Sequence, residues 1–297
     1  MKLKEQLAQR AKELQLAPRR LLQHYAMERF LYRLSLSPHA NRLFLKGGML
    51  LAGMGFTQAR HTMDIDFLGQ LNNSTDNIRK AFREIVHTKP GIQDGVSFSD
   101  SFTLEEITKD ALYVGTRVTF DANVAGEKLE MKADIGFSDV ILPQPQALSY
   151  PCILPGLPEA RLLCYSKESI VAEKWEAMVK LNRINSRMKD FYDLWVLSHG
   201  YSFDYDSLRL AITGTFERRG TSLDSYKLLD AEAYKDSKQT EWATYIRKMK
   251  ADTFMRKPPL ELPPKDFSAV MEHIMQWLAP VMTGHRLHRW TPGKGWK

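Results

Sequence analysis

Apolar residues near the start of the chain recur about every three to four positions, which is the spacing of amphipathic helices. They predict a helix over 1–17. A second helix is predicted over about 19–36, opened by Pro18 because proline is tolerated in a first helical turn. A further helix is predicted at about 75–87, where apolar residues again form one stripe.

Between about 96 and 141 the apolar spacing falls to two, which is typical of strands. The pattern predicts one strand that carries Val96, Phe98 and Phe102, and two more at 113–121 and 128–136, which are joined by a turn that contains Gly126. The strand at 128–136 alternates between apolar residues that face the core and polar residues that face away from it: Leu129, Met131 and Ala133 against Glu130, Lys132 and Asp134.

The second half of the chain is predicted to be helical. A proline-rich passage from Pro143 to Pro158 is interpreted as a boundary loop, and Ser166 opens the first helix after it. Helices are then predicted at about 167–182, 186–198, 206–213, 223–234, 238–250 and 266–281. These elements indicate an α+β fold, with a small mixed sheet flanked by helices in residues 1–150 and a mainly helical lobe in residues 151–297.

The stretch from Phe44 to Phe67 carries the clearest chemical pattern. It is predicted to contain a short apolar strand, a glycine pair, a helical segment and a second strand with Asp64 and Asp66. Side chains two apart on a strand point to the same face, so both carboxylates are expected to look into one site. Adjacent carboxylates repel each other unless a cation neutralises them, and their hard oxygen ligands suit Mg²⁺. The apolar residues that alternate with them are expected to face the core: Met63, Ile65 and Phe67.

The glycine pair, Gly47 and Gly48, is predicted to approach a bound anion. Glycine lets the backbone come close to a ligand, and successive N–H groups where a helix begins donate to phosphates. Each feature has an ordinary explanation when it stands alone, since Asp-x-Asp is often a solvated strand end and Gly-Gly is often a turn. Their combination in a strand–helix–strand order indicates nucleotide chemistry.

These residues resemble the signature of the DNA polymerase β-type nucleotidyltransferases, in which a glycine motif is followed by two aspartates. The stretch is most similar to the AbiEii/AbiGii toxin family, and the resemblance covers about residues 20–220. The residues that match the family motif are Lys46, Gly47, Gly48, Arg60, Thr62, Asp64, Ile65, Asp66 and Phe67. The resemblance implies the sheet core of these enzymes, followed by a helical lobe that closes the nucleotide cleft.

A polymerase-type transferase needs a third carboxylate, which completes the metal site and can accept the proton of an attacking hydroxyl. Asp134 is the candidate, because it ends the polar face of a strand that can pair beside the Asp64 strand. Its setting, KADIGFSD, also resembles a family segment. Glu130, on the same face, is the alternative, and a carboxylate that faces water is the ordinary explanation for Asp134.

The segment that begins AEKWEAM and ends KDFYDLWVLS resembles the family's second half. In relatives, the lysine that matches Lys174 contacts the nucleotide triphosphate, and the aspartate that matches Asp190 is needed for activity. A lysine at the edge of a buried stripe is usually a surface residue whose stem packs on the helix. Asp190 is interpreted as orienting Lys174 or a nucleotide hydroxyl, and Asp193 as a structural partner of Lys189 or Arg187.

The resemblance therefore predicts transfer of NMP from an NTP to an acceptor hydroxyl. Mg²⁺, with Mn²⁺ as the alternative, is expected to be held by Asp64, Asp66 and Asp134, and the same three residues with Lys174 and Asp190 form the predicted catalytic set. The predicted nucleotide contacts are Lys46, Gly47, Gly48, Arg60, Thr62 and Lys174.

The biological role also follows from the resemblance. AbiEii-like proteins are toxins of bacterial toxin–antitoxin and phage abortive-infection systems, paired with a winged-helix antitoxin. Because related toxins extend the 3′ end of tRNA, tRNA is the candidate acceptor. Transfer to a protein hydroxyl and a non-catalytic nucleotide-binding partner module are the alternatives.

Composition adds a weak indication of the partner and the compartment. A net charge of +7, with basic residues in excess in 1–40, favours a polyanionic partner such as RNA, with solvated surface as an equal alternative. The chain contains no apolar run long enough to span a membrane and no secretory signal, and its two cysteines are too few for a disulfide framework, so a cytoplasmic location is expected. P-loop, zinc-protease and serine-hydrolase motifs are absent.

Overall fold

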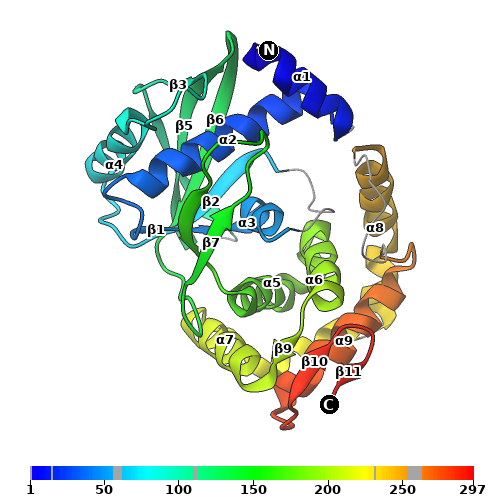
Figure 1. Cartoon of the computed structure of the whole chain (residues 1–297). Helices are drawn as coiled ribbons and strands as arrows, with labels where there is room; N and C mark the ends of the chain where they lie inside the picture. Colours follow the sequence, from blue (N-terminus) through cyan, green and yellow to red (C-terminus); the bar gives the residue numbers. More distant parts are fainter. Residues whose placement is uncertain (1, 15, 56–61, 110–112, 231, 253–262) are drawn as a thin grey trace. The chain divides into compact units, whose positions relative to one another are not determined.

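The segments of the chain pack into two units in the computed structural model, which describes residues 2–14, 16–55, 62–109, 113–230, 232–252 and 263–297 (Figure 1). The first unit comprises Met1–Ser138 and Gln146–Cys164, and the second comprises Asp139–Pro145 and Tyr165–Lys297. The domain boundary predicted after residue 150 stays a prediction, because two groups of residues that pack together need not be two separate domains.

The first unit is built on a mixed sheet of eight strands in its described part. Their order is β3-β5-β6-β2-β1-β8-β7, and β4 pairs with β5 as well. The strands are β1 (Leu43–Lys46), β2 (Asp64–Gly69), β3 (Val96–Phe98), β4 (Thr103–Lys109), β5 (Tyr113–Val124), β6 (Glu127–Gly136), β7 (Gln146–Tyr150) and β8 (Ala160–Cys164).

The predicted α+β class with a mixed sheet is confirmed, but the sheet is larger than expected. Strands β4, β7 and β8 were not predicted, and β7 lies inside the passage that was interpreted as a boundary loop. That interpretation of Pro143–Pro158 is wrong for residues 146–150, which pair antiparallel with β8. Prolines flank this strand on both sides, and the strand is too short to show a clear alternation of apolar and polar residues.

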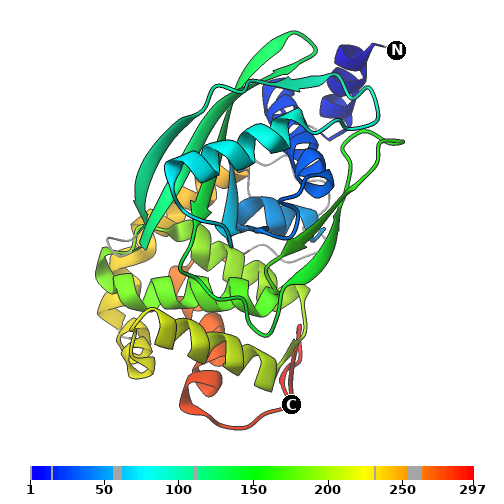
Figure 2. The same cartoon turned by 90° about the vertical axis from the view of Figure 1, so that its left-hand side faces the viewer.

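The helices of the first unit are α1 (Leu3–Glu13), α2 (Pro18–Leu36), α3 (Gly47–Gly53) and α4 (Thr75–His87). Figure 2 shows α2 and α4 lying across the strands of the sheet. Phe30 of α2, Phe82 of α4 and Phe120 of β5 meet there, with ring centroids 5.2 to 5.9 Å apart. Because side chains alternate along β5, Phe120 faces these helices and Arg117 lies on the opposite face.

The second unit is mainly helical, as predicted. Its elements are α5 (Lys167–Leu181), η1 (Asn182–Ile184), α6 (Met188–Gly200), β9 (Phe203–Asp204), α7 (Tyr205–Arg218), η2 (Leu223–Asp230), α8 (Glu232–Asp252), α9 (Phe267–Thr283), β10 (Arg289–Thr291) and β11 (Gly295–Trp296). The predicted helix at 223–234 is wrong in type, because residues 223–230 form a 3₁₀ helix. No described helix of either unit combines the length and the apolar character that crossing a membrane requires.

The segment Asp139–Pro145 belongs to the second unit because specific contacts tie it there. The guanidinium of Arg219 lies 2.7 Å from a carboxylate oxygen of Asp139. The hydroxyls of Ser166 and Ser169 donate to the carbonyl of Leu142 at 2.6 and 2.8 Å. Ser166 also accepts a hydrogen bond from the backbone of Ser169, which confirms it as the N-cap of α5.

Candidate active site

A row of charged side chains crosses one face of the sheet, with one residue from each of four neighbouring strands. Lys46 on β1 is the register partner of Asp66 on β2, and Asp66 is the partner of Asp134 on β6. Asp134 in turn is the partner of Arg117 on β5. Register partners point to the same face, so the row runs from one cation through two adjacent carboxylates to a second cation. The predicted pairing of the Asp134 strand beside the Asp64 strand is confirmed.

Asp64 lies two residues before Asp66, on the same face and half-buried. Burial raises the pKa of the Asp64 carboxyl, and the negative charges of Asp134 and Asp66 raise it further. The carboxylates are therefore close enough for each charge to destabilise the other, which is the condition that a bound cation would relieve.

Met63 departs from the predicted alternation. Its side chain is 49% exposed, whereas Ile65 and Phe67 are fully buried. The prediction that Met63 faces the core is wrong, because pairing of β2 begins only at Asp64. The side-chain alternation of a strand does not extend to residues outside it.

The glycine pair packs directly against the acidic strand. Gly47 has φ +68°, and a Cβ at this position would overlap the carboxylate of Asp66. A Cβ at Gly48 would lie 2.8 Å from the Cβ of Thr62, closer than real Cβ atoms approach one another. Gly47 is thus required for its backbone conformation and for space, and Gly48 for space alone.

Three further residues of the predicted nucleotide set are less informative. The hydroxyl of Thr62 donates to the carbonyl of Asp64 at 3.1 Å, and Thr62 is only 7% exposed. Lys46 is half-buried at the end of β1. Arg60 lies outside the described residues.

Asp134 is buried and engaged by Arg117. Nε of Arg117 donates to one carboxylate oxygen at 2.8 Å, and Nη2 donates to the other at 3.0 Å. Arg117 was not among the predicted site residues. Its strand was predicted, but only the register of β5 on β6 shows that Arg117 meets Asp134.

The residues present fit a divalent cation in part. Across the described residues, no group of three or more His, Cys, Asp or Glu side chains is arranged to hold a metal ion. Asp64 and Asp66 offer hard oxygen ligands on one face, and Mg²⁺ usually takes one or two carboxylates and completes its shell with water and phosphates. Asp134 could join them only after Arg117 releases its oxygens.

Lys174 and Asp190 form a second charged cluster, within the helical unit. Nζ of Lys174 on α5 donates to Asp190 at 2.8 Å and to Asp193 at 2.6 Å, both on α6. The Lys174 side chain is 10% exposed, and those of Asp190 and Asp193 are 4% and 2% exposed. Lys174 is therefore a buried ion-pair partner, unlike the surface lysine that helix position alone would suggest.

Asp190 receives a second positive charge from Arg187, whose Nε lies 3.1 Å from its other oxygen. Burial opposes ionisation, but the charges of Lys174 and Arg187 outweigh it and lower the pKa of Asp190 to about 2. Asp193 pairs with Lys174 and Arg187 pairs with Asp190. The pairing of Asp193 with Lys189 or Arg187 stays a prediction.

Comparison with known protein families shows which family the chain belongs to. Residues 29–273 match the family described as "Nucleotidyl transferase AbiEii toxin, Type IV TA system". The chain belongs to this family. The resemblance stated from the motif residues is confirmed, and the family places the chain among nucleotidyltransferase toxins of type IV toxin–antitoxin systems.

Two solved structures are similar to this AbiEii-family chain. One is of a Helicobacter pylori protein assigned as a nucleotidyltransferase, with 15% identity, 92% of this chain and 100% of that chain covered, and a TM-score of 0.48. The other is of JHP933 from Helicobacter pylori, with 15% identity, 87% and 93% covered, and the same TM-score of 0.48. No curated protein matches the chain.

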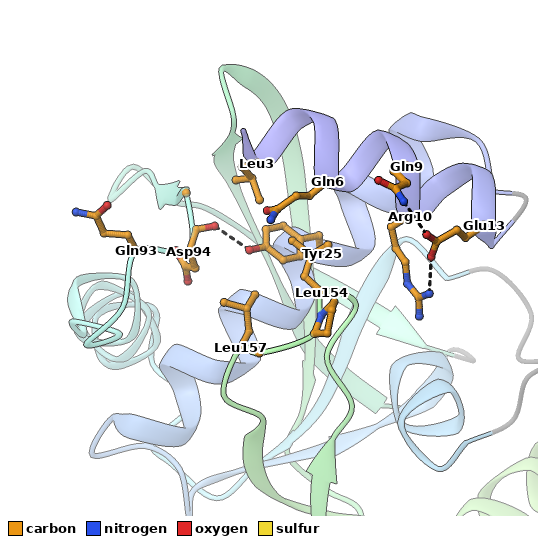
Figure 3. A pocket seen from close by; sticks show the side chains of 13 residues that line it. Leu3, Gln6, Gln9, Arg10, Glu13, Tyr25, Gln93, Asp94, Leu154 and Leu157 are labelled. Carbon is orange, nitrogen blue, oxygen red and sulfur yellow. Dashed lines mark hydrogen bonds and ion pairs between the residues drawn. The ribbon is translucent and has the colours of Figure 1, made fainter. Parts of the chain in front are cut away.

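The AbiEii-family chain also has a cavity of about 600 Å³ in its first unit, between α1 and the loops around Asp94 and Leu157 (Figure 3). Tyr25 and amide side chains of α1 line it, and the hydroxyl of Tyr25 donates to the carbonyl of Asp94 at 2.8 Å. Its lining includes none of the described residues that were predicted to bind nucleotide or metal. Lys46, Asp66 and Asp134 lie instead on the charged face of the sheet.

Proposed function

We propose that this protein transfers NMP from an NTP to an acceptor hydroxyl and releases pyrophosphate. The observation that carries the proposal is the parallel register of β2 and β6, which brings Asp64, Asp66 and Asp134 to one face beside Gly47. This placement supports nucleotidyl transfer in a chain whose family consists of nucleotidyltransferases.

In the proposed reaction the acceptor oxygen attacks the α-phosphorus, and the bond to the bridging oxygen of the β-phosphate breaks. Asp134 accepts the proton of the hydroxyl, and pyrophosphate leaves with the electron pair of the broken bond. Gly47 and Gly48 allow the backbone to approach the phosphates, where their N–H groups can donate. The step depends chiefly on positioning and on stabilisation of negative charge.

Asp64 and Asp66 are the residues proposed to hold Mg²⁺, or Mn²⁺ in its place. When bound, the cation would neutralise negative charge on the phosphates of the NTP. Burial raises the pKa of Asp64, and the negative charges of Asp134 and Asp66 raise it further. A cation would relieve the repulsive part of this shift, which supports the assignment.

Lys174 is proposed to bind triphosphate oxygens, and Asp190 to orient it. The two short contacts of Lys174 with Asp190 and Asp193 support a fixed ammonium, since two buried carboxylates hold it in one place. Lys46, Thr62 and Arg60 are proposed as further phosphate contacts from the family motif.

The acceptor is proposed to be the 3′ end of tRNA, and the partner a cognate winged-helix antitoxin in the cytoplasm. The family supports an antitoxin partner. The net charge of +7 supports an RNA acceptor, because basic surfaces attract the phosphate backbone.

The test is incorporation of radiolabelled NTPs into total tRNA, with and without Mg²⁺, by wild type and Asp66→Asn. Label in RNA that requires Mg²⁺ and Asp66 is the expected result. Radiolabel that migrates with protein instead of RNA on a gel would show that the acceptor is a protein hydroxyl. No transfer of any NTP, together with equal toxicity of wild type and Asp66→Asn in cells, would remove the proposed activity.

A further inference from the structure

Arg117 engages both oxygens of Asp134, the carboxylate to which the proposed reaction assigns a proton. The two hydrogen bonds, at 2.8 and 3.0 Å, are a bidentate arrangement in which the planar guanidinium matches the carboxylate. While this pair is intact, the lone pairs that face Arg117 are not open to a cation or to a hydroxyl proton.

The two partners differ in their access to water. The side chain of Asp134 is 4% exposed, whereas that of Arg117 is 32% exposed. A buried carboxylate stays ionised only beside a positive charge, whereas a half-buried arginine already in contact with water can turn toward solvent if another cation replaces it. Arg117 is therefore the partner that can leave.

Arg117 also acts on the rest of the carboxylate face. Asp66 is the register partner of Asp134, and Asp64 lies on the same face two residues earlier. Without a bound cation, the guanidinium offsets the repulsion among these groups. A divalent cation on Asp64 and Asp66 would bring positive charge to the same place, so the cation and Arg117 compete.

We propose that Arg117 is a positioning residue that takes the place of a cation at Asp134 and releases this carboxylate when a divalent cation binds. The inference rests on the proposed function, because it assumes that Asp64 and Asp66 hold the cation. Once released, Arg117 remains on the face where the triphosphate would bind, and its positive charge is then available to phosphate oxygens.

The test measures Mn²⁺ binding to the full chain without nucleotide, at pH 8, by electron paramagnetic resonance of free Mn²⁺. Arg117→Gln is expected to bind Mn²⁺ about tenfold more tightly than wild type, the factor that corresponds to one lost charged hydrogen bond. A purely structural role would not produce this gain, because damage to the site lowers affinity.

Lys132→Gln is the matched control. Lys132 is the register partner of Asp64 and binds Glu130 at 2.8 Å, so the change removes an equal charge beside the same carboxylates. Its effect is expected to stay below about threefold, since screened surface charges interact weakly. An equal gain in Lys132→Gln, or no gain in Arg117→Gln, would overturn the role of Arg117.

Two further variants keep the outcome interpretable. In an Asp134→Asn background, Arg117→Gln is expected to add no gain, and a gain there would contradict competition at Asp134. Arg117→Lys, which keeps the charge but cannot bridge both oxygens, serves if Arg117→Gln does not fold, and it is expected to bind Mn²⁺ more tightly than wild type.

Asp64→Asn separates failure of this inference from failure of the proposed function. Loss of Mn²⁺ binding in Asp64→Asn, with no change in Arg117→Gln, would leave the proposed metal site standing and remove the role of Arg117. Mn²⁺ binding that is the same in Asp64→Asn and wild type would remove both.

Discussion

Asp66 and Asp134 are register partners in a parallel pair of strands, so two carboxylates from distant parts of the sequence lie side by side on one face of the sheet. The pair sits between two cations of the same row, Lys46 beside Asp66 and Arg117 beside Asp134. The two flanking cations stabilise ionised carboxylates that would otherwise repel each other.

Loss of either carboxylate of the proposed metal pair should stop the reaction. Asp64→Asn and Asp66→Asn are each expected to lower nucleotide incorporation by about a thousandfold or more, because the step depends on charge stabilisation. Asp121→Asn is the control, since it removes a partly exposed carboxylate of the neighbouring strand β5 that lies outside the predicted site. Incorporation assays with matched thermal unfolding curves decide between chemistry and folding, and equal losses in all three variants would contradict the assignment.

Gly47→Ala should disturb Asp66 directly. A methyl group would overlap the Asp66 carboxylate, and the residue would also have to keep φ +68°. Gly91→Ala is the matched control, because Gly91 has φ +70° and open space around its missing Cβ. Gly91→Ala is expected to cost about 1 kcal/mol of unfolding free energy and Gly47→Ala about 2 kcal/mol more, measured by urea denaturation. Equal losses of unfolding free energy in the two variants would show that the Asp66 side chain moves aside without strain.

Replacing Lys174 should destabilise the helical unit as well as remove the proposed phosphate contact. Lys174→Met leaves two buried carboxylates, Asp190 and Asp193, without their shared cation. The expected loss of unfolding free energy is about 3 to 5 kcal/mol. Lys227→Met, which breaks an exposed pair with Asp224, should cost less than about 1 kcal/mol. A Lys174→Met variant as stable as wild type would contradict the ion-pair cluster seen here.

Acid should weaken the same cluster over a defined range of pH. The pKa of Asp190 is about 2 in the folded chain, below its ordinary value of 3.8, so folding is favoured while this carboxyl is ionised. The contribution, about 2 kcal/mol, is complete above pH 4 and is lost as the pH falls toward 2.

Urea titrations at a series of pH values check this contribution. Asp190→Asn should lack the part of the acid dependence that falls between pH 4 and 2, whereas Asp224→Asn, at an exposed position, should retain it. An acid dependence that is the same in wild type and Asp190→Asn would show that the Asp190 carboxyl is not the group responsible.

Most helices could be predicted because their evidence is local. The predicted bounds 75–87 are those of α4, and Pro18 and Ser166 mark helix starts through their own backbone and side-chain chemistry. Strands β7 and β8 escaped prediction for the opposite reason. Strand β7 has five residues between prolines, and it is recognisable only through its pairing with β8. Strand β8 pairs with β1, which is more than 100 residues earlier in the sequence.

The candidate site divides in the same way. The amino-acid sequence alone determined that Asp64 and Asp66 share a face and that a helix begins at the glycine pair, since side-chain alternation and glycine conformations are properties of neighbouring residues. Only the tertiary structure decided that Asp134 lies beside Asp66, that Arg117 holds Asp134, and that two carboxylates bury Lys174: Asp190 and Asp193. Strand register and helix packing are set by burial of the whole core, and no short stretch of sequence contains that information.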